Sequence, residues 1–328
     1  MNDRIDLARL LADLEPKVRQ EFEQALRKHA ARIDVRALAD ALARGDVAEA
    51  ERIANVEPRE LFPLGEILRG VFFGAATLAG RGKRGVVGQF SFDGRHPEAE
   101  RWVSENGALL VTRITEESRD AVRTAVLAGL EESRSPQSVA LDIAGRRVGD
   151  TRTGGFVGLT GPQATSIARA RAALTSGDPV RMREYLSLKL RDRRFDALIR
   201  KAIREGKPVK AADLDRILSA HKAKALAYRG RMIAQVETFK AASAGRDQAY
   251  RQMLGMPGVT GVSVRWQHNL SAVPRVDHVA MNGTVIQIGQ AFQFPDGTAM
   301  RYPHDETAPA SHVIGCRCTA IYRVQVEK

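Results

Sequence analysis

The sequence predicts an α+β protein in which helical N-terminal and middle regions precede a small, β-rich C-terminal module. The composition, with 44% hydrophobic and only 5% aromatic residues, is typical of helical proteins rich in Ala, Leu and Arg. Apolar residues recur at spacings of three and four along most of the chain, and this spacing changes to alternation after Gly258. Because 328 residues are many for one core, we expect two or three domains.

Residues 1–70 are predicted to form a helical extension. Its first helix carries one apolar stripe made of Leu7, Leu10, Leu11, Leu14, Val18, Phe22 and Leu26. Two shorter helices are predicted over 35–44, ended by Gly45, and over 47–54. The N-terminus is charged throughout, unlike the apolar core of a secretion signal. We also expect no apolar stretch long enough to span a bilayer, and therefore no membrane partner.

The composition changes over residues 71–95, which we interpret as a Gly-rich, basic linker. Three bases cluster within it at Arg81, Lys83 and Arg84. We expect a domain boundary near residue 90, followed by a helical middle domain over 96–255.

The middle domain is predicted to begin with a long helix that Pro136 ends. One face of this helix carries Leu110, Ile114, Val122, Val126 and Leu130. A Gly- and Thr-rich break precedes a helix that starts near Pro162 and stops before Gly177. Further helices are predicted through 181–210, from Asp213 to Ala227 and over 233–238.

Residues 181–210 form a strongly basic window within a chain of net charge +12. The window holds eleven Lys/Arg against four acids, a net charge of +7: Arg181, Arg183, Lys189, Arg191, Arg193, Arg194, Arg200, Lys201, Arg204, Lys207 and Lys210. This excess predicts a phosphate backbone as partner, and no base-reading motif is present, so double-stranded DNA would be bound without sequence preference. The alternative is a solvated helix face that serves only solubility.

The last segment, 256–328, is predicted to be the β-rich module. Val262, Val264 and Trp266 alternate with smaller or polar residues, as in a half-buried strand. A second strand is predicted over 284–286, and a third over 319–326. Between them Pro295-Asp296-Gly297 supplies the turn of a hairpin.

Two cysteines in this module suggest a metal site. Cys316 and Cys318 are two residues apart, so on a strand they would point to the same face. With His278 and His268 they would make a tetrahedral zinc site. The structural alternative is that His278 hydrogen-bonds within the core, near Asp305 or a backbone carbonyl, and that both thiols are simply buried. So few cysteines indicate a reducing compartment and no disulfide framework.

The order of residues in this module resembles the signature of the phage head morphogenesis family, the minor capsid proteins similar to phage Mu protein F. The residues that carry the resemblance are His278, Gly283, Phe292, Pro303, Asp305 and Cys316-Arg317-Cys318. Upstream, Gly158-Leu159 with Gln163, and Ile233-Ala234 with Glu237, resemble two short steps of the same family. The chain departs from the family at Gly315, where Asn is frequent, and lacks the further upstream cysteines of some members.

This resemblance extends from about Phe90 and is strongest over 275–318. It implies a minor head protein of a tailed phage or prophage that assists head morphogenesis and DNA packaging or delivery. Such a protein would lie in the virion near the portal, and in the host cytoplasm during assembly. Its partners would be the portal protein and a major capsid or scaffold protein. Glu237 would be a buried polar residue or a solvated acid paired with Arg231 or Lys240.

An alternative interpretation of the same residues is a metal-dependent nuclease or toxin-like effector. Its candidate residues would be His278, His304, Asp305 and His312. No recognisable nuclease motif is present, so we assign no catalytic residue and expect no enzyme activity. A third alternative is a helical interaction protein.

Overall fold

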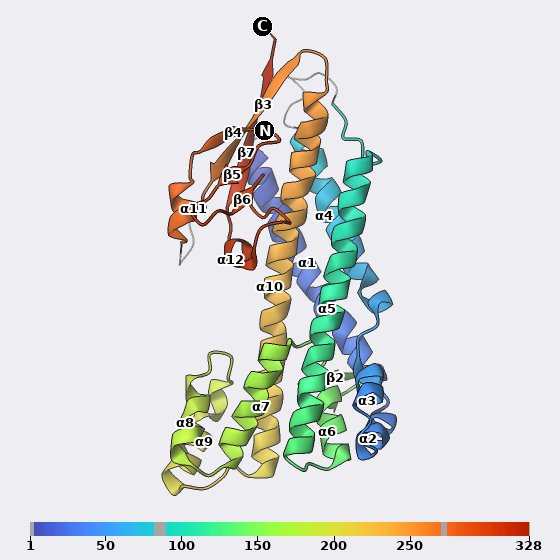
Figure 1. The fold of residues 1–328 in the computed structure, drawn as a ribbon, viewed down its shortest axis with the longest axis vertical. Coiled ribbons are helices and arrows are strands. Elements are labelled where there is room, and N and C mark those ends of the chain that lie inside the picture. The colour runs from blue at the N-terminus through green and yellow to red at the C-terminus, as the bar shows by residue number, and fades with distance from the viewer. Residues whose placement is uncertain (1–2, 82–89, 270–273, 328) are drawn as a thin grey trace. The chain divides into compact units, whose positions relative to one another are not determined.

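The computed structural model describes residues 3–81, 90–269 and 274–327 (Figure 1). It confirms the predicted fold class, since it is 65% helical with small antiparallel sheets near the C-terminus. The chain divides into two compact units: unit 1 holds Met1–Glu21, Pro63–Leu110 and Arg231–Lys328, and unit 2 holds Phe22–Phe62 and Val111–Gly230. The units differ from the predicted contiguous segments because long helices contribute residues to both.

Unit 1 packs helices against the C-terminal module around one hydrophobic core. It contains the first part of α1 (Asp3–Arg32), nearly all of α4 (Phe62–Arg81), the first part of α5 (Pro97–Glu131) and the second part of α10 (Ala211–Leu254). Leu11, Phe72, Tyr250 and Trp266 are among the buried residues of this core. The core therefore joins helices to the sheet of the module.

The predicted linker is wrong over its first part, because residues 71–81 belong to helix α4. Val71, Phe72 and Ala75 are fully buried in the core of unit 1. Small residues permit this packing, since a Cβ added at Gly245 of α10 would collide with the backbone oxygen of Phe72. Lys83 and Arg84, in the predicted basic linker, lie outside the described residues.

One segment, Val47–Arg81, is apolar and long enough to cross a membrane by length and composition alone, which differs from the sequence-based expectation. Helix α4 lies within this segment and buries Leu64, Leu68 and Val71. Such burial accounts for its hydropathy as that of a core helix.

The C-terminal module follows the predicted alternation. Strand β3 (Val259–Gln267) is central in a three-stranded antiparallel sheet of order β4-β3-β7, with β4 (Val285–Gln287) and β7 (Thr319–Val326). The predicted hairpin forms from β5 (Phe292–Gln293) and β6 (Ala299–Met300). Two short helices, α11 (Val276–Ala280) and α12 (Ala310–Val313), flank these strands in the sequence.

Unit 2 is almost entirely helical. Besides the remaining parts of α1, α5 and α10, it contains α2 (Val35–Ala43), α3 (Val47–Ala54), η1 (Pro58–Leu61), α6 (Pro136–Ala144), α7 (Gly161–Thr175), α8 (Pro179–Ser187), η2 (Arg193–Phe195) and α9 (Asp196–Glu205). A small hairpin of β1 (Arg146–Val148) and β2 (Thr151–Thr153) occupies part of the segment that we expected to be a break. Pro136 begins α6, after α5 has ended at Glu131.

Helix α10 is continuous over 44 residues, where the sequence predicted two helices. Gly230 lies between the two predicted helices. A Cβ at this position would lie 3.2 Å from the Phe22 ring. The glycine therefore serves close packing of α10 on α1 within unit 2, which offsets its poor helix propensity.

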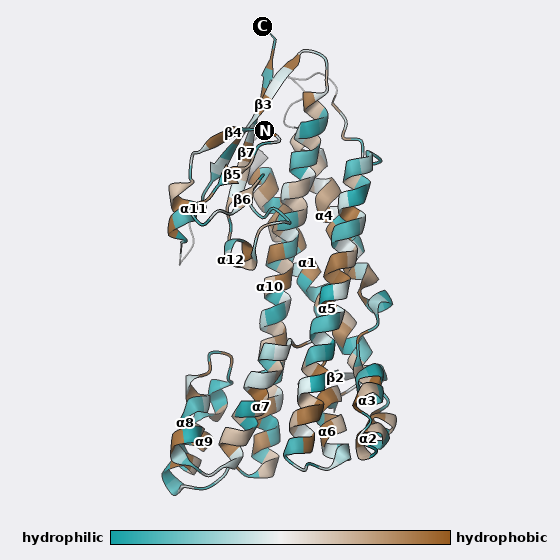
Figure 2. Ribbon diagram, viewed as in Figure 1, coloured by the Kyte–Doolittle hydropathy of each residue, from teal (hydrophilic) through white to brown (hydrophobic). Residues whose placement is uncertain are grey.

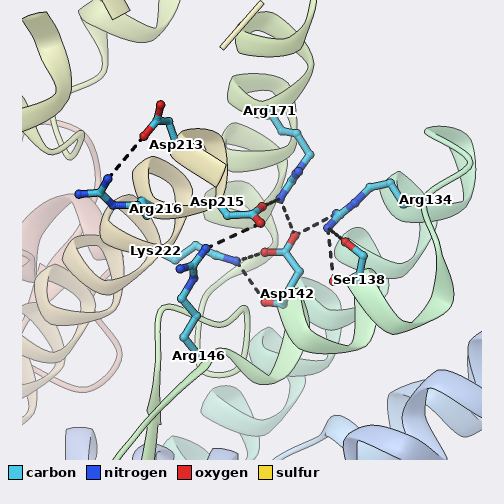
Figure 3. Close-up of polar contacts among 9 residues, drawn as sticks. All are labelled: Arg134, Ser138, Asp142, Arg146, Arg171, Asp213, Asp215, Arg216 and Lys222. Carbon is cyan, nitrogen blue, oxygen red and sulfur yellow. Dashed lines mark hydrogen bonds and ion pairs between the residues drawn. The ribbon is translucent and has the colours of Figure 1, made fainter. Parts of the chain in front are cut away.

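A buried ion network fixes α6 to α10 in unit 2 (Figure 3). The Asp142 carboxylate accepts hydrogen bonds from Lys222, from Arg134 at 2.9 Å and from Arg171 at 3.2 Å. The Lys222 side chain is only 2% exposed, and its Nζ also donates to the backbone oxygen of Asp142 at 3.1 Å. Burial would raise the pKa of Asp142, but Lys222, Arg171 and Arg134 together lower it well below its usual range.

We expect Asp142→Asn to destabilise the protein by about 3–5 kcal/mol at pH 7, because it leaves the buried Lys222 ammonium without its counter-charge. The folded-state pKa of Asp142 is depressed, so its contribution is present above the pKa of the unfolded chain and declines as the pH falls through the folded-state value. Urea unfolding at several pH values measures both effects. The exposed Asp150 provides the control, and an Asp142→Asn variant no less stable than Asp150→Asn would contradict the role of this network.

Candidate metal centre and basic surface

Three buried side chains of the C-terminal module gather their metal-ligating atoms at one point. His278 comes from α11, whereas Cys316 and Cys318 lie just before β7. The Nδ1 atom of His278 lies 3.4 Å from the Cys316 Sγ and 3.5 Å from the Cys318 Sγ. The three ligand atoms all lie within 4.8 Å of one another, and each residue is at most 4% exposed.

These distances match the geometry of a tetrahedral zinc ion. With a Zn–S bond of about 2.3 Å and a Zn–N bond of about 2.0–2.1 Å, a nitrogen and a sulfur ligand lie about 3.5 Å apart. Both thiols are free of disulfide. The side chains thus form a His/Cys cluster that is compatible with a metal ion.

A hydrogen-bond relay behind His278 orients its ring. The Nε2 atom of His278 lies 3.0 Å from the His312 Nδ1, and the His312 Nε2 lies 2.8 Å from the Asp296 Oδ2. The hydrogen bond from His312 lowers the pKa of Asp296 to about 2, so its carboxylate can only accept. With both imidazoles neutral, His312 donates from Nε2 and His278 donates from Nε2 to His312. The lone pair of the His278 Nδ1 then faces the two sulfurs, as metal binding requires.

The pKa values of the two thiols shift in opposite directions. A hydrogen bond from Cys318 lowers the pKa of Cys316, against the opposing effect of burial. The same contact with Cys316 raises the pKa of Cys318, and burial raises it too. A metal binds the deprotonated sulfur, so the lowered pKa of Cys316 favours metal binding at this position.

His268, the fourth ligand expected from the sequence, is not part of this cluster in the described residues. It directly follows the end of β3, where its backbone N–H donates to the Asn282 side chain at 2.9 Å. This bond holds His268 in the connection between β3 and β4.

As in the structural alternative considered from the sequence, His278 is hydrogen-bonded within the core and both thiols are buried, but its partner among the described residues is His312 and not Asp305. The Asp305 carboxylate accepts hydrogen bonds from the Arg301 backbone N–H at 2.8 Å, from the Arg301 guanidinium, and from Thr307 at 2.8 and 3.0 Å. Asp305 therefore holds the turn after β6. These bonds involve both carboxylate oxygens, and Asp305 is not a member of either candidate metal-ligating group among the described residues.

The other residues of the family-like signature lie in turns or pack against neighbouring side chains. Gly283 has φ +89°, a conformation that L side chains rarely adopt, and its N–H donates to the Trp266 backbone oxygen at 2.9 Å. Phe292 packs edge-on against Trp266, with ring centroids 5.2 Å apart, and Pro303 is buried. Arg317 lies over the Phe239 ring at 5.7 Å.

Glu237 is buried and pairs with Lys240 at 3.0 Å, so one of the two bases expected from the sequence is its partner. Its position on α10 places it in unit 1, as part of an ion pair rather than of the metal-ligating cluster.

Two members of the relay were missed from the sequence as partners of His278. Asp296 was assigned only to a turn, and His312 only to the nuclease alternative. The available signal was the position of His312, four residues before Cys316. Sequence spacing could not reveal that α12 faces α11 closely enough for His312 to reach His278.

The basic window lies in unit 2 on α8, η2, α9 and the connections around them, and teal residues predominate on α8 in Figure 2. Ten of its eleven bases are exposed, and Arg191 is half-buried. Three bases have ion-pair partners: Arg191 with Asp196, Arg194 with Asp192, and, at 3.9 Å, Lys201 with Glu205. The other eight have no acidic group within 4.0 Å among the described residues, so most of the charge faces solvent.

Comparisons of the chain with protein-family models, with curated proteins and with solved structures found no match.

Proposed function

We propose that this protein is a minor head protein of a tailed phage or prophage. It would associate with the portal and assist head morphogenesis and DNA packaging or delivery, inside the virion and in the host cytoplasm during assembly. The observation that supports this function most is the folding of the family-like signature. His278 and the Cys316-Arg317-Cys318 step, 38 residues apart, meet in one buried cluster, while Gly283, Phe292 and Asp305 support the surrounding module. The resemblance thus extends to residues that depend on one another physically.

The cluster would bind zinc through His278, Cys316 and Cys318. Zinc supplies a rigid, redox-inert link between its ligands, and here it would join α11 to the start of β7. Such a link would add to the stability of the module beyond the core that the module shares with the helices of unit 1. In this function the module is a docking unit, and its rigidity serves assembly with the portal and capsid or scaffold proteins.

The basic window would contact packaged double-stranded DNA. Most of the exposed bases on α8 and α9 have no acidic ion-pair partner among the described residues, so they can neutralise phosphates. Their side chains come from short helices without a base-reading motif, which favours backbone contact without sequence preference.

We expect purified protein to contain one zinc ion per chain by elemental mass spectrometry. Cys318→Ser should abolish this zinc, because a hydroxyl is a poor replacement for a thiolate, and should lower the melting temperature of unit 1. His268→Ala is the matched control and should keep full zinc content. Wild-type protein that is folded and free of zinc after expression in zinc-supplemented medium would refute the zinc centre.

We expect Arg193→Glu, Arg200→Glu and Lys201→Glu together to weaken binding of random-sequence duplex DNA and to make its salt dependence shallower. The slope of log K against log salt should decrease by roughly one for each phosphate that the variant no longer neutralises. Fluorescence anisotropy at several salt concentrations measures this slope. A control triple variant at Arg36, Arg44 and Arg119, also exposed bases of unit 2, should keep the wild-type slope. Equal slopes in the two variants would contradict the assignment of this window.

We expect the tagged protein to co-purify with the portal protein encoded near its own gene when the two are co-expressed. The complex should survive nuclease treatment, because the contact is between proteins. Loss of the portal protein on nuclease treatment would mean that the two proteins only bind the same DNA. That outcome would contradict the portal-associated function.

A further inference from the structure

His304 is a buried histidine without a hydrogen bond. It is 1% exposed, and neither of its ring nitrogens has a hydrogen-bond partner among the described residues. An imidazole that is buried with unpaired nitrogens loses its hydrogen bonds to water without replacement, which costs free energy. Both ring nitrogens of His304 are therefore available to a ligand that the described residues do not supply.

The backbone at His304 is also unusual. Its φ is +65°, in the left-handed region that non-glycine residues seldom adopt. Strained backbone of this kind is often found where a side chain must be aimed at a functional site. The hydrogen bonds of Asp305 hold the turn that sets this conformation, as its carboxylate accepts from both Arg301 and Thr307.

His304 approaches the metal centre from a different segment than His278. Its ring packs on Phe239 with ring centroids 5.0 Å apart, and the guanidinium of Arg317, the residue between the two cysteines, lies 5.7 Å from the centroid of the same Phe239 ring. His278 comes from α11, before β4, whereas His304 comes from the segment after β6. The two rings therefore come from separate elements of the module.

The other polar side chains near the cluster are already engaged. Both ring nitrogens of His312 make short contacts, with His278 and with Asp296. Asp305 is occupied by the turn, and His268 is held at the end of β3. Elimination among these described residues leaves His304 with two nitrogens available to a ligand.

We propose that His304 is the fourth ligand of the zinc centre, which completes a Cys₂His₂ set with His278, Cys316 and Cys318. This inference rests on the proposed zinc site. The ligand atoms that already lie within 4.8 Å of one another do not include His304, so its ring must turn toward the sulfurs when the ion binds. Rotation about its side-chain torsions moves the ring without moving the turn that Asp305 holds.

Four protein ligands give the centre a structural rather than a catalytic character. A zinc ion with three protein ligands keeps one position for water, which it can activate as a nucleophile. His304 would occupy that position and close the site. The ion would then stabilise the fold of the module and would not hydrolyse DNA.

Cobalt substitution of the full-length protein tests this inference, because the visible d–d absorption of Co²⁺ reports its coordination number. We expect wild-type protein to show the intense bands of a four-coordinate, tetrahedral site. His304→Asn tolerates the left-handed backbone, and should weaken zinc binding at least 10- to 100-fold and reduce these bands as water enters. His268→Asn, the matched control, should leave both properties unchanged.

His304→Cys gives a second measurement that does not depend on the behaviour of the Asn variant. A third thiolate ligand should raise the near-ultraviolet sulfur-to-cobalt absorption by about half, since that absorption scales with the number of thiolate ligands. Wild-type spectra and zinc affinity in both His304 variants would overturn the ligand assignment and leave a three-residue zinc centre in place. Wild-type protein that binds neither Co²⁺ nor Zn²⁺ would overturn the zinc centre itself, and with it this inference.

Discussion

The meeting of His278 with Cys316 and Cys318 is the contact on which the C-terminal module depends. It links α11, which follows β3, to the start of β7, the last strand of the sheet. The Trp266 indole packs edge-on against the His278 ring, with ring centroids 5.4 Å apart. The His/Cys cluster therefore borders the hydrophobic core. In so small a module, a few buried groups of this kind set the relative positions of most of the loops.

Unit 2 uses charge in two opposite ways. Around Asp142 the charges are buried, and three cations converge on one carboxylate to hold α6 and α10 together. On α8 and α9 the bases point outward and most lack an acidic partner among the described residues. Buried ion networks specify packing, whereas exposed bases remain available to a polyanion. This division supports separate roles for the network and for the basic surface within unit 2.

The closed metal centre that we propose would suit an assembly protein better than an enzyme. Asp305, the only acid of the nuclease alternative, uses both carboxylate oxygens in a turn. His312 is occupied by Asp296 and His278. Each of these groups orients or supports the cluster, and their positions favour stability of the module. The proposed contacts with DNA and with the portal protein would then come from surfaces rather than from a catalytic site.

The sequence by itself determined the features that depend on neighbouring residues. Alternation located β3 and β7, the Pro295-Asp296-Gly297 turn located the hairpin, and the spacing of the two cysteines placed their sulfurs beside one ring. Only the tertiary structure decided which distant groups join them. It placed His312 beside His278 and kept His268 out of the cluster, and it drew residues 71–81 into helix α4. The physical reason is that side-chain periodicity reports the local backbone, whereas the partners of a buried group depend on how remote elements pack.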